Sequence, residues 1–141
     1  MVSHLLYGTA LIAITVAIHT GVLGWIIWWL QHHRPVVAYS FWIEYSLLAR
    51  IAVVCVFAHL AEIAVWAVFY VWQDVMPEPG VAFYFSAVTY ATIGYGDIVP
   101  PAEWRLIASM EGLTGILMCA WSGGFIFAVV VRLREKRPPA H

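Results

Sequence analysis

The chain has 141 residues, of which 63% are hydrophobic and only 11% charged, and its formal net charge is −1. A soluble domain is usually about 45–50% apolar and about 25% charged, so the composition predicts an integral membrane protein. The near-zero net charge gives no reason to expect a nucleic-acid partner, and two cysteines inside apolar runs, Cys55 and Cys119, give no disulfide framework.

Three apolar runs are long enough to cross a bilayer, which takes about 20 helical residues. They cover residues 5–30, 46–72 and 105–131. The first run lacks a basic leader and a small-residue cleavage site, so we interpret it as a helix and not as a signal peptide. The sequence therefore predicts an all-α membrane protein with three transmembrane helices.

A fourth apolar segment, "FYFSAVTYA", ends at residue 91 and is too short to span. Proline and glycine interrupt the chain on both sides of it, at Pro77, Pro79, Gly80, Gly94, Gly96, Pro100 and Pro101. This pattern predicts a short re-entrant helix over residues 81–91 that returns as extended chain. Such backbone is tolerated at membrane depth only where protein buries it or water lines it.

Charge placement predicts the orientation. Residues 132–141, "RLREKRPPAH", are strongly basic, and the first connection contains "QHHR". The re-entrant region carries Asp74, Glu78, Asp97 and Glu103 against one Arg105. Because Lys and Arg favour the cytoplasmic side, we expect a multi-pass protein of the cell membrane with its N-terminus outside and its C-terminus in the cytoplasm.

The stretch "TIGYGD", Thr92 to Asp97, follows the re-entrant helix directly. Glycine adopts left-handed backbone angles at little cost, and alternating such angles turns successive carbonyls to one side. Gly94 and Gly96 are spaced to do this, so the carbonyls of Thr92, Ile93, Gly94 and Tyr95 would form one row with the Thr92 hydroxyl. One row cannot surround a cation, so a pore of this kind must be shared between identical subunits.

This stretch closely resembles the selectivity filter of potassium channels, and the resemblance extends over about residues 46–131. It implies a homotetramer in the lipid bilayer that passes K⁺ passively, with no other cofactor and no enzymatic activity. Residues 46–72 would be the outer helix, 81–91 the pore helix and 105–131 the inner helix, with 5–30 as an extra N-terminal helix and 132–141 as a basic tail. The implied K⁺-binding residues of the filter are Thr92, Ile93, Gly94, Tyr95 and Gly96, with Asp97 and Tyr84 at the outer mouth.

The glycines of the third span resemble the hinge region of the inner helix in this family. By position Gly115 is the best candidate, and Gly112, Gly123 and Gly124 are its rivals. The other interpretation is that these small residues only allow close helix packing. Both interpretations stay open at the level of the sequence.

The pore helix departs from better-known members, which often carry two tryptophans where this chain has Tyr84 and Phe85. Tyr84 can still donate a hydrogen bond to Asp97, whereas Phe85 cannot. Val88 stands where some members have a glutamate. This difference bears on the stiffness of the filter and not on its selectivity.

Ionisable residues lie inside the spans, where they are costly and usually paired. His59 and Glu62 share one face of the second span at i and i+3, and Glu111 lies in the third. We expect either a structural hydrogen-bond network or a proton-sensing group that biases the gate. His19, in the first span, is expected to be packed or to snorkel toward the membrane surface.

Two other functions compete with conduction. His19 and His59 could be the axial ligands of a membrane haem, although this leaves "TIGYGD" unexplained. A non-conducting subunit that keeps the channel fold and regulates a partner is the second alternative. No span carries a ladder of arginines that would sense voltage.

Overall fold

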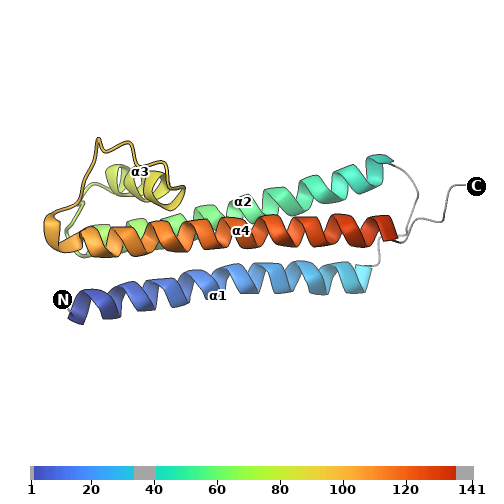
Figure 1. Ribbon diagram of the computed structural model, residues 1–141, viewed down its shortest axis with the longest axis horizontal. Coiled ribbons are helices and arrows are strands. Elements are labelled where there is room, and N and C mark those ends of the chain that lie inside the picture. The colour runs from blue at the N-terminus through green and yellow to red at the C-terminus, as the bar shows by residue number, and fades with distance from the viewer. Residues whose placement is uncertain (1, 34–40, 136–141) are drawn as a thin grey trace, which may run out of the picture.

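The computed structural model describes residues 2–33 and 41–135 of the chain. Its elements are α1 (Val2–His33), α2 (Phe41–Trp72), α3 (Pro79–Tyr90), a short 3₁₀ turn η1 (Ala102–Trp104) and α4 (Arg105–Glu135). The described residues are helical or irregular and contain no strand. Helices α1, α2 and α4 run lengthwise, and the short α3 lies beside them at one end (Figure 1). The predicted all-α fold with one short helix between the last two spans is therefore confirmed.

Three helices are long and apolar enough to cross a membrane, and the protein is a multi-pass membrane protein. Each extends beyond the predicted run: α1 begins before Leu5, α2 begins at Phe41, and α4 continues through Glu135. The difference arises because hydropathy marks only the apolar part of a helix, whereas backbone hydrogen bonding continues past it. Four residues of the predicted basic tail are thus helical, and residues 136–141 lie outside the described part of the chain.

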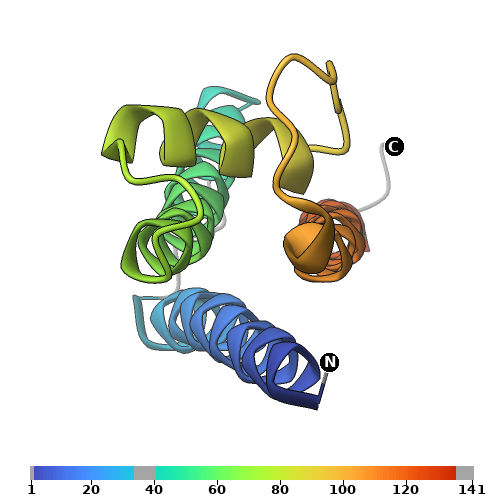
Figure 2. The same ribbon diagram turned by 90° about the vertical axis from the view of Figure 1, so that its left-hand side faces the viewer.

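The two middle helices, α2 and α4, have different neighbours on their two sides. Helix α1 packs along both of them on one side, and α3 packs against both on the opposite side (Figure 2). Around α3 the core contains the fully buried side chains Trp66, Tyr70, Tyr90 and Ile107. A second cluster, which includes Leu23, Ile26, Leu47, Ile51 and Cys55, joins α1, α2 and α4 farther along the bundle.

Helix α3 has well-defined ends. Pro79 occupies its first turn after Glu78 in extended conformation, a position where the missing proline N–H costs nothing. Its C-terminus closes where the N–H of Ala91 donates to Ala87 and the N–H of Thr92 donates to Thr89. Thr92 has φ +58°, so the helix cannot continue and the chain turns out of it there.

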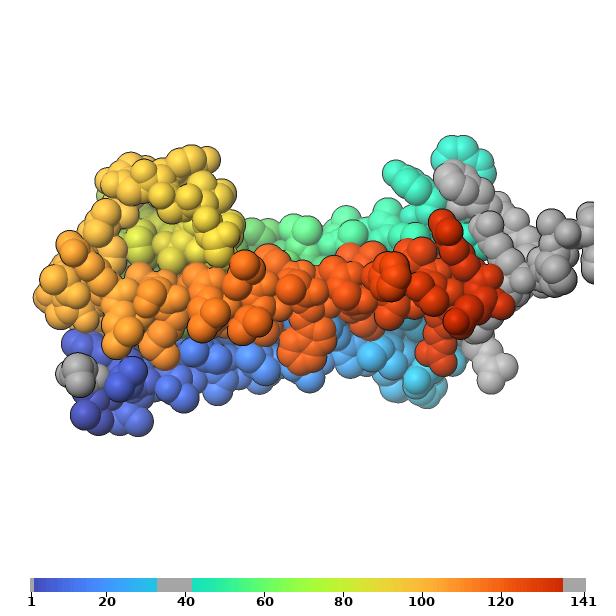
Figure 3. Space-filling view, viewed as in Figure 1, coloured from blue at the N-terminus to red at the C-terminus, as the bar shows by residue number. Residues whose placement is uncertain are grey.

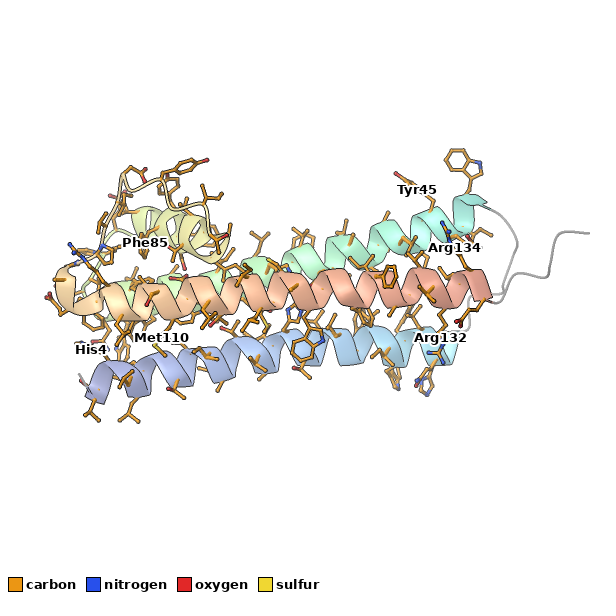
Figure 4. The ribbon with its side chains drawn as sticks, viewed as in Figure 1. His4, Tyr45, Phe85, Met110, Arg132 and Arg134 are labelled. Carbon is orange, nitrogen blue, oxygen red and sulfur yellow. The ribbon has the colours of Figure 1, made fainter. Side chains whose placement is uncertain are left out.

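The two ends of the bundle differ in chemistry. The start of α1 and the α3 region share one end (Figure 1). Arg132 and Arg134 lie at the opposite end from Phe85 of α3 (Figure 4). This arrangement agrees with the predicted grouping of the N-terminus with the re-entrant region, and the side that faces the cytoplasm stays a prediction.

Much of α4 is uncovered within one chain. Residues of α3 and the following loop stand above α4 at one end only, and the rest of that face of α4 is bare (Figure 3). The exposed large apolar side chains of α4 include Leu113, Ile116, Leu117, Trp121 and Phe127. An apolar surface of this extent suits contact with lipid or with other membrane-embedded protein.

Candidate functional site

The segment Thr92–Asp97, called the filter segment below, has an alternating backbone. Thr92, Gly94 and Gly96 have φ of +58°, +56° and +77°, whereas Ile93 and Tyr95 between them are not left-handed. The left-handed angles predicted for Gly94 and Gly96 are confirmed, and Thr92 adds a third that the sequence did not indicate. A non-glycine residue at such an angle costs about 1–2 kcal/mol, so surrounding structure must hold Thr92 there.

Hydrogen bonds to α3 hold the start of the filter segment. The N–H groups of Ile93 and Gly94 donate to the carbonyl oxygen of Val88 at N···O distances of 2.9 and 3.3 Å. In a trans peptide the C=O points opposite to the N–H of the next residue. The carbonyls of Thr92 and Ile93 therefore both point away from α3, in the common direction that a row of ion-binding oxygens requires.

The other end of the filter segment is fixed by a side-chain hydrogen bond. The hydroxyl of Tyr84 donates to Asp97 Oδ2 at 2.7 Å, as predicted. This bond lowers the pKa of the Asp97 carboxyl group, and it raises the pKa of Tyr84. Asp97 is thereby held ionised. Phe85, which cannot make such a bond, packs edge-on against Tyr70 with ring centroids 5.3 Å apart.

Side chains of the filter segment find little cover in their own chain. Ile93 is 53% exposed and Tyr95 is 69% exposed. A cleft of about 230 Å³ separates α3 from the outer part of the segment. Its lining includes Tyr84, Phe85, Val88, Thr89, Gly94, Tyr95 and Arg105. One chain therefore leaves more than half of the Ile93 and Tyr95 side chains uncovered.

Two glycines of α4 face the C-terminal end of α3. A Cβ on Gly115 would lie 2.0 Å from the backbone oxygen of Tyr90, and one on Gly112 would lie 3.4 Å from that of Thr89. Gly123 and Gly124 have no such neighbour within 4 Å. Gly115 therefore has a packing role, since only glycine fits so close to another backbone. A hinge at any of the four glycines stays a prediction.

Five side chains from all three long helices and α3 form one polar group, buried except for part of His59, which is called the His–Glu cluster below. Its members are His19, His59, Glu62, Tyr90 and Ser122. His19 Nδ1 lies 2.9 Å from Glu62 Oε1, and the Tyr90 hydroxyl donates to Glu62 Oε2. Ser122 Oγ lies 3.1 Å from His59 Nε2 and 3.2 Å from His19 Nε2. Through Tyr90 the cluster ends two residues before Thr92.

Glu111 belongs to a separate buried group. It accepts hydrogen bonds from the hydroxyls of Tyr70, at 2.8 Å, and Ser86. From the sequence, His59, Glu62 and Glu111 are predicted to form one group. In the structure His59 and Glu62 are neighbours, and Glu111 has other partners. Shared depth in the membrane does not fix which way a helix face turns, and packing against α3 turns Glu111 toward Ser86.

His19 is the functional candidate whose partners sequence reasoning missed. Its side chain is fully buried and paired with Glu62, so it does not snorkel. One signal could have found it: His19 and Glu62 are both near the middle of adjacent antiparallel spans, where an unpaired ionisable group is costly. A titrating role for the cluster stays a prediction.

The ion channel family matches residues 46–132, which contain most of α2, all of α3, the filter segment and most of α4. The protein belongs to the potassium channel pore-domain family. Helix α1 lies outside the matched residues of this family. The voltage-gated potassium channel Kch of Escherichia coli (strain K12) is 46% identical over 52 residues. These residues are 36% of this chain and 12% of that protein, so the chain matches a small part of the relative's length. Comparison with solved structures gave no significant match.

Proposed function

We propose that the protein is a K⁺-selective channel in which four identical chains bring their filter segments together around one axis. The observation that carries this proposal is the alternating backbone of Thr92, Gly94 and Gly96, with the Thr92 and Ile93 carbonyls turned to one side. Four such rows would replace the hydration shell of a K⁺ ion with the oxygens of Thr92, Ile93, Gly94 and Tyr95. Conduction is passive, because nothing more than exchange between adjacent oxygen rings is needed.

The exposed surfaces of one chain support assembly. Ile93 and Tyr95 are more than half exposed, and α4 presents an uncovered apolar face. Neighbouring chains in a closed ring would cover both, since a rotationally symmetric contact repeats until the ring closes. A homotetramer would cover these exposed side chains and would also supply the three further rows of carbonyl oxygens that one chain lacks.

Fixed charges support a cation as the permeant ion. The C-terminal end of α3, which carries partial negative charge, is at the start of the filter segment, and ionised Asp97 is at its other end. We place Asp97 at the outer mouth and the basic end of α4, with Arg132 and Arg134, in the cytoplasm. The N-terminus is then outside the cell membrane.

Liposome flux tests this function directly. Purified protein should carry K⁺ and exclude Na⁺, and Gly94→Ala should abolish K⁺ flux because alanine resists the left-handed angle at φ +56° in every chain. Gly24→Ala is the matched control, since a Cβ there meets nothing within 4 Å. Cross-linking in the same membranes should give a tetramer. Equal K⁺ and Na⁺ flux, or unchanged flux in Gly94→Ala, would contradict the proposal.

The two competing functions have separate outcomes. A folded tetramer without K⁺ flux would favour the non-conducting regulatory subunit. A haem held between His19 and His59 is disfavoured by their geometry: both rings bond to the same Ser122 hydroxyl, with ring centroids 5.2 Å apart. Two axial ligands must lie on opposite faces of a porphyrin, which these rings cannot do.

A further inference from the structure

The side chains of the His–Glu cluster meet between α1, α2, α3 and α4. Both imidazoles turn Nδ1 toward Glu62, with His19 at 2.9 Å and His59 at 3.5 Å from its carboxylate oxygens. Both turn Nε2 toward Ser122. The donor atoms of His19, His59 and Glu62 all lie within 4.8 Å of one another. Three potential ligands thus face a common centre.

A proton count shows that the cluster needs one more cation. With Glu62 ionised and the imidazoles neutral, each imidazole has one N–H, and Tyr90 and Ser122 each have one O–H. These protons must serve the contacts His19–Glu62, Tyr90–Glu62, His59–Tyr90, His59–Ser122 and His19–Ser122. One contact is left with two acceptors and no proton. Among the described residues, these two histidines are the basic side chains found within ion-pair distance of Glu62, and both are neutral in this count.

The donor set and its spacing suit Zn²⁺. Two imidazole nitrogens and one carboxylate are a common zinc ligand set, with bonds of about 2.0–2.2 Å, so that tetrahedral ligands are about 3.3 Å apart. His19 Nδ1 lies 2.9 Å from Glu62 Oε1 and His59 Nδ1 lies 3.5 Å from Glu62 Oε2, on either side of this value, and one donor atom from each residue lies within 4.8 Å of the other two. Ser122 can accept an N–H from both Nε2 atoms, which leaves both Nδ1 lone pairs free for the metal. The Tyr90 hydroxyl, 3.1 Å from His59 Nδ1, is in position as a fourth donor.

We propose that His19, His59 and Glu62 form a transition-metal site of the Zn²⁺ class that joins α1 to α2 beside the end of α3. Of the three ligands only His59 is partly accessible, with 17% of its side chain exposed against 1% for His19 and 0% for Glu62. A bound ion would bridge the acceptor atoms that the available protons leave without a donor. This site does not depend on the channel conducting K⁺.

Metal titration of the full chain, purified without a histidine tag, tests the site. Co²⁺ should bind at one per chain with the visible absorption of a four-coordinate ion, and Zn²⁺ should displace it. His19→Gln and Glu62→Gln should each weaken binding by more than the roughly 10–100-fold expected for Ser122→Ala, which removes only a residue that orients the ligands. His32→Gln is the matched control, because His32 is an exposed histidine of α1, the helix that also carries His19. It should leave metal binding unchanged.

Absence of Co²⁺ binding by the wild type, or equal binding by His19→Gln, would overturn the proposal and leave a bridging proton as the extra cation. X-ray absorption of the Zn²⁺-loaded wild type gives a test that needs no variant to fold. Nitrogen and oxygen ligands with imidazole scattering support the site. Sulfur scattering would assign the metal to Cys55 or Cys119 and would reject the proposed site. Loss of flux with intact metal binding would count against the channel function alone.

Discussion

The His–Glu cluster includes Tyr90, and the filter segment begins two residues after it. The two regions differ in how many of their contacts are made within one chain. In the cluster and the Glu111 group, every buried side-chain nitrogen and oxygen among the described residues has a hydrogen-bond partner in the same chain. In the filter segment the N–H groups of Ile93 and Gly94 are held by α3, but Ile93 and Tyr95 are largely exposed. Buried polar atoms thus lie within hydrogen-bond distance of partners in the same chain, whereas the side chains of the filter segment are left largely uncovered.

Tyr90 is where the two regions meet. Its hydroxyl bonds to Glu62, and its backbone oxygen lies against Gly115 of α4. Changes near Tyr90 should thus disturb both regions, and changes farther away should disturb one. The following variants test this division, beginning with the largest expected effect.

Gly115→Ala should have the largest effect on stability. Its Cβ would lie 2.0 Å from the Tyr90 oxygen, so α3 and α4 must move apart. We expect a loss of about 2 kcal/mol or more in the free energy of unfolding, because overpacking at the upper end of its usual range, about 3 kcal/mol, is offset by a gain of up to about 1 kcal/mol in helix propensity. Reversible unfolding in mixed micelles measures it, and K⁺ flux should fall as well.

Gly123→Ala is the control for this variant, because a Cβ there meets no atom within 4 Å. It should keep or slightly raise stability through helix propensity alone. If Gly123→Ala abolished flux while stability stayed unchanged, the predicted hinge of the inner helix would be assigned to Gly123 and not to Gly115. Equal stability of Gly115→Ala and the wild type would show that α3 is not packed against α4 as described.

Tyr70→Phe should affect the interior and spare the filter segment. It removes the hydroxyl that donates to Glu111 at 2.8 Å but keeps the buried ring. We expect a loss of about 1–2 kcal/mol in the free energy of unfolding, with K⁺ over Na⁺ selectivity unchanged. Tyr7→Phe, at an exposed tyrosine of α1, should change neither. A change of selectivity in Tyr70→Phe would mean that the two regions are not separable.

Tyr84→Phe should have the smallest effect on stability and should act on pH dependence. The Tyr84 hydrogen bond lowers the pKa of Asp97, so the charge of Asp97 is present above that lowered value and is lost as the pH falls through it. Without the bond, Asp97 should become neutral at a higher pH. K⁺ flux measured at decreasing external pH should therefore decline earlier in Tyr84→Phe than in the wild type. A pH midpoint of the flux decline that is unchanged or lower in Tyr84→Phe would contradict this prediction. Asp97→Asn is the control and should show no such decline of flux with pH.

The sequence predicted the spans and the filter segment because local signals carry them. Hydropathy marks a span, and Gly94 and Gly96 mark left-handed backbone whatever surrounds them. The left-handed angle of Thr92 was not predictable, because the end of α3 and the Val88 carbonyl impose it on a residue that does not prefer it. The i, i+3 spacing correctly placed His59 with Glu62. The partners His19 and Ser122, and the separation of Glu111, depend on how helices rotate against each other, which residue order does not encode locally.

Helix α1 lies on the side of α2 and α4 that is opposite to α3, yet His19 holds the same carboxylate as Tyr90. A displacement of α1 relative to α2 would therefore act on the His19–Glu62 contact, and through Glu62 on Tyr90. A peripheral helix outside the family match is thus connected, through one shared carboxylate, to the residue that lies two positions before the filter segment.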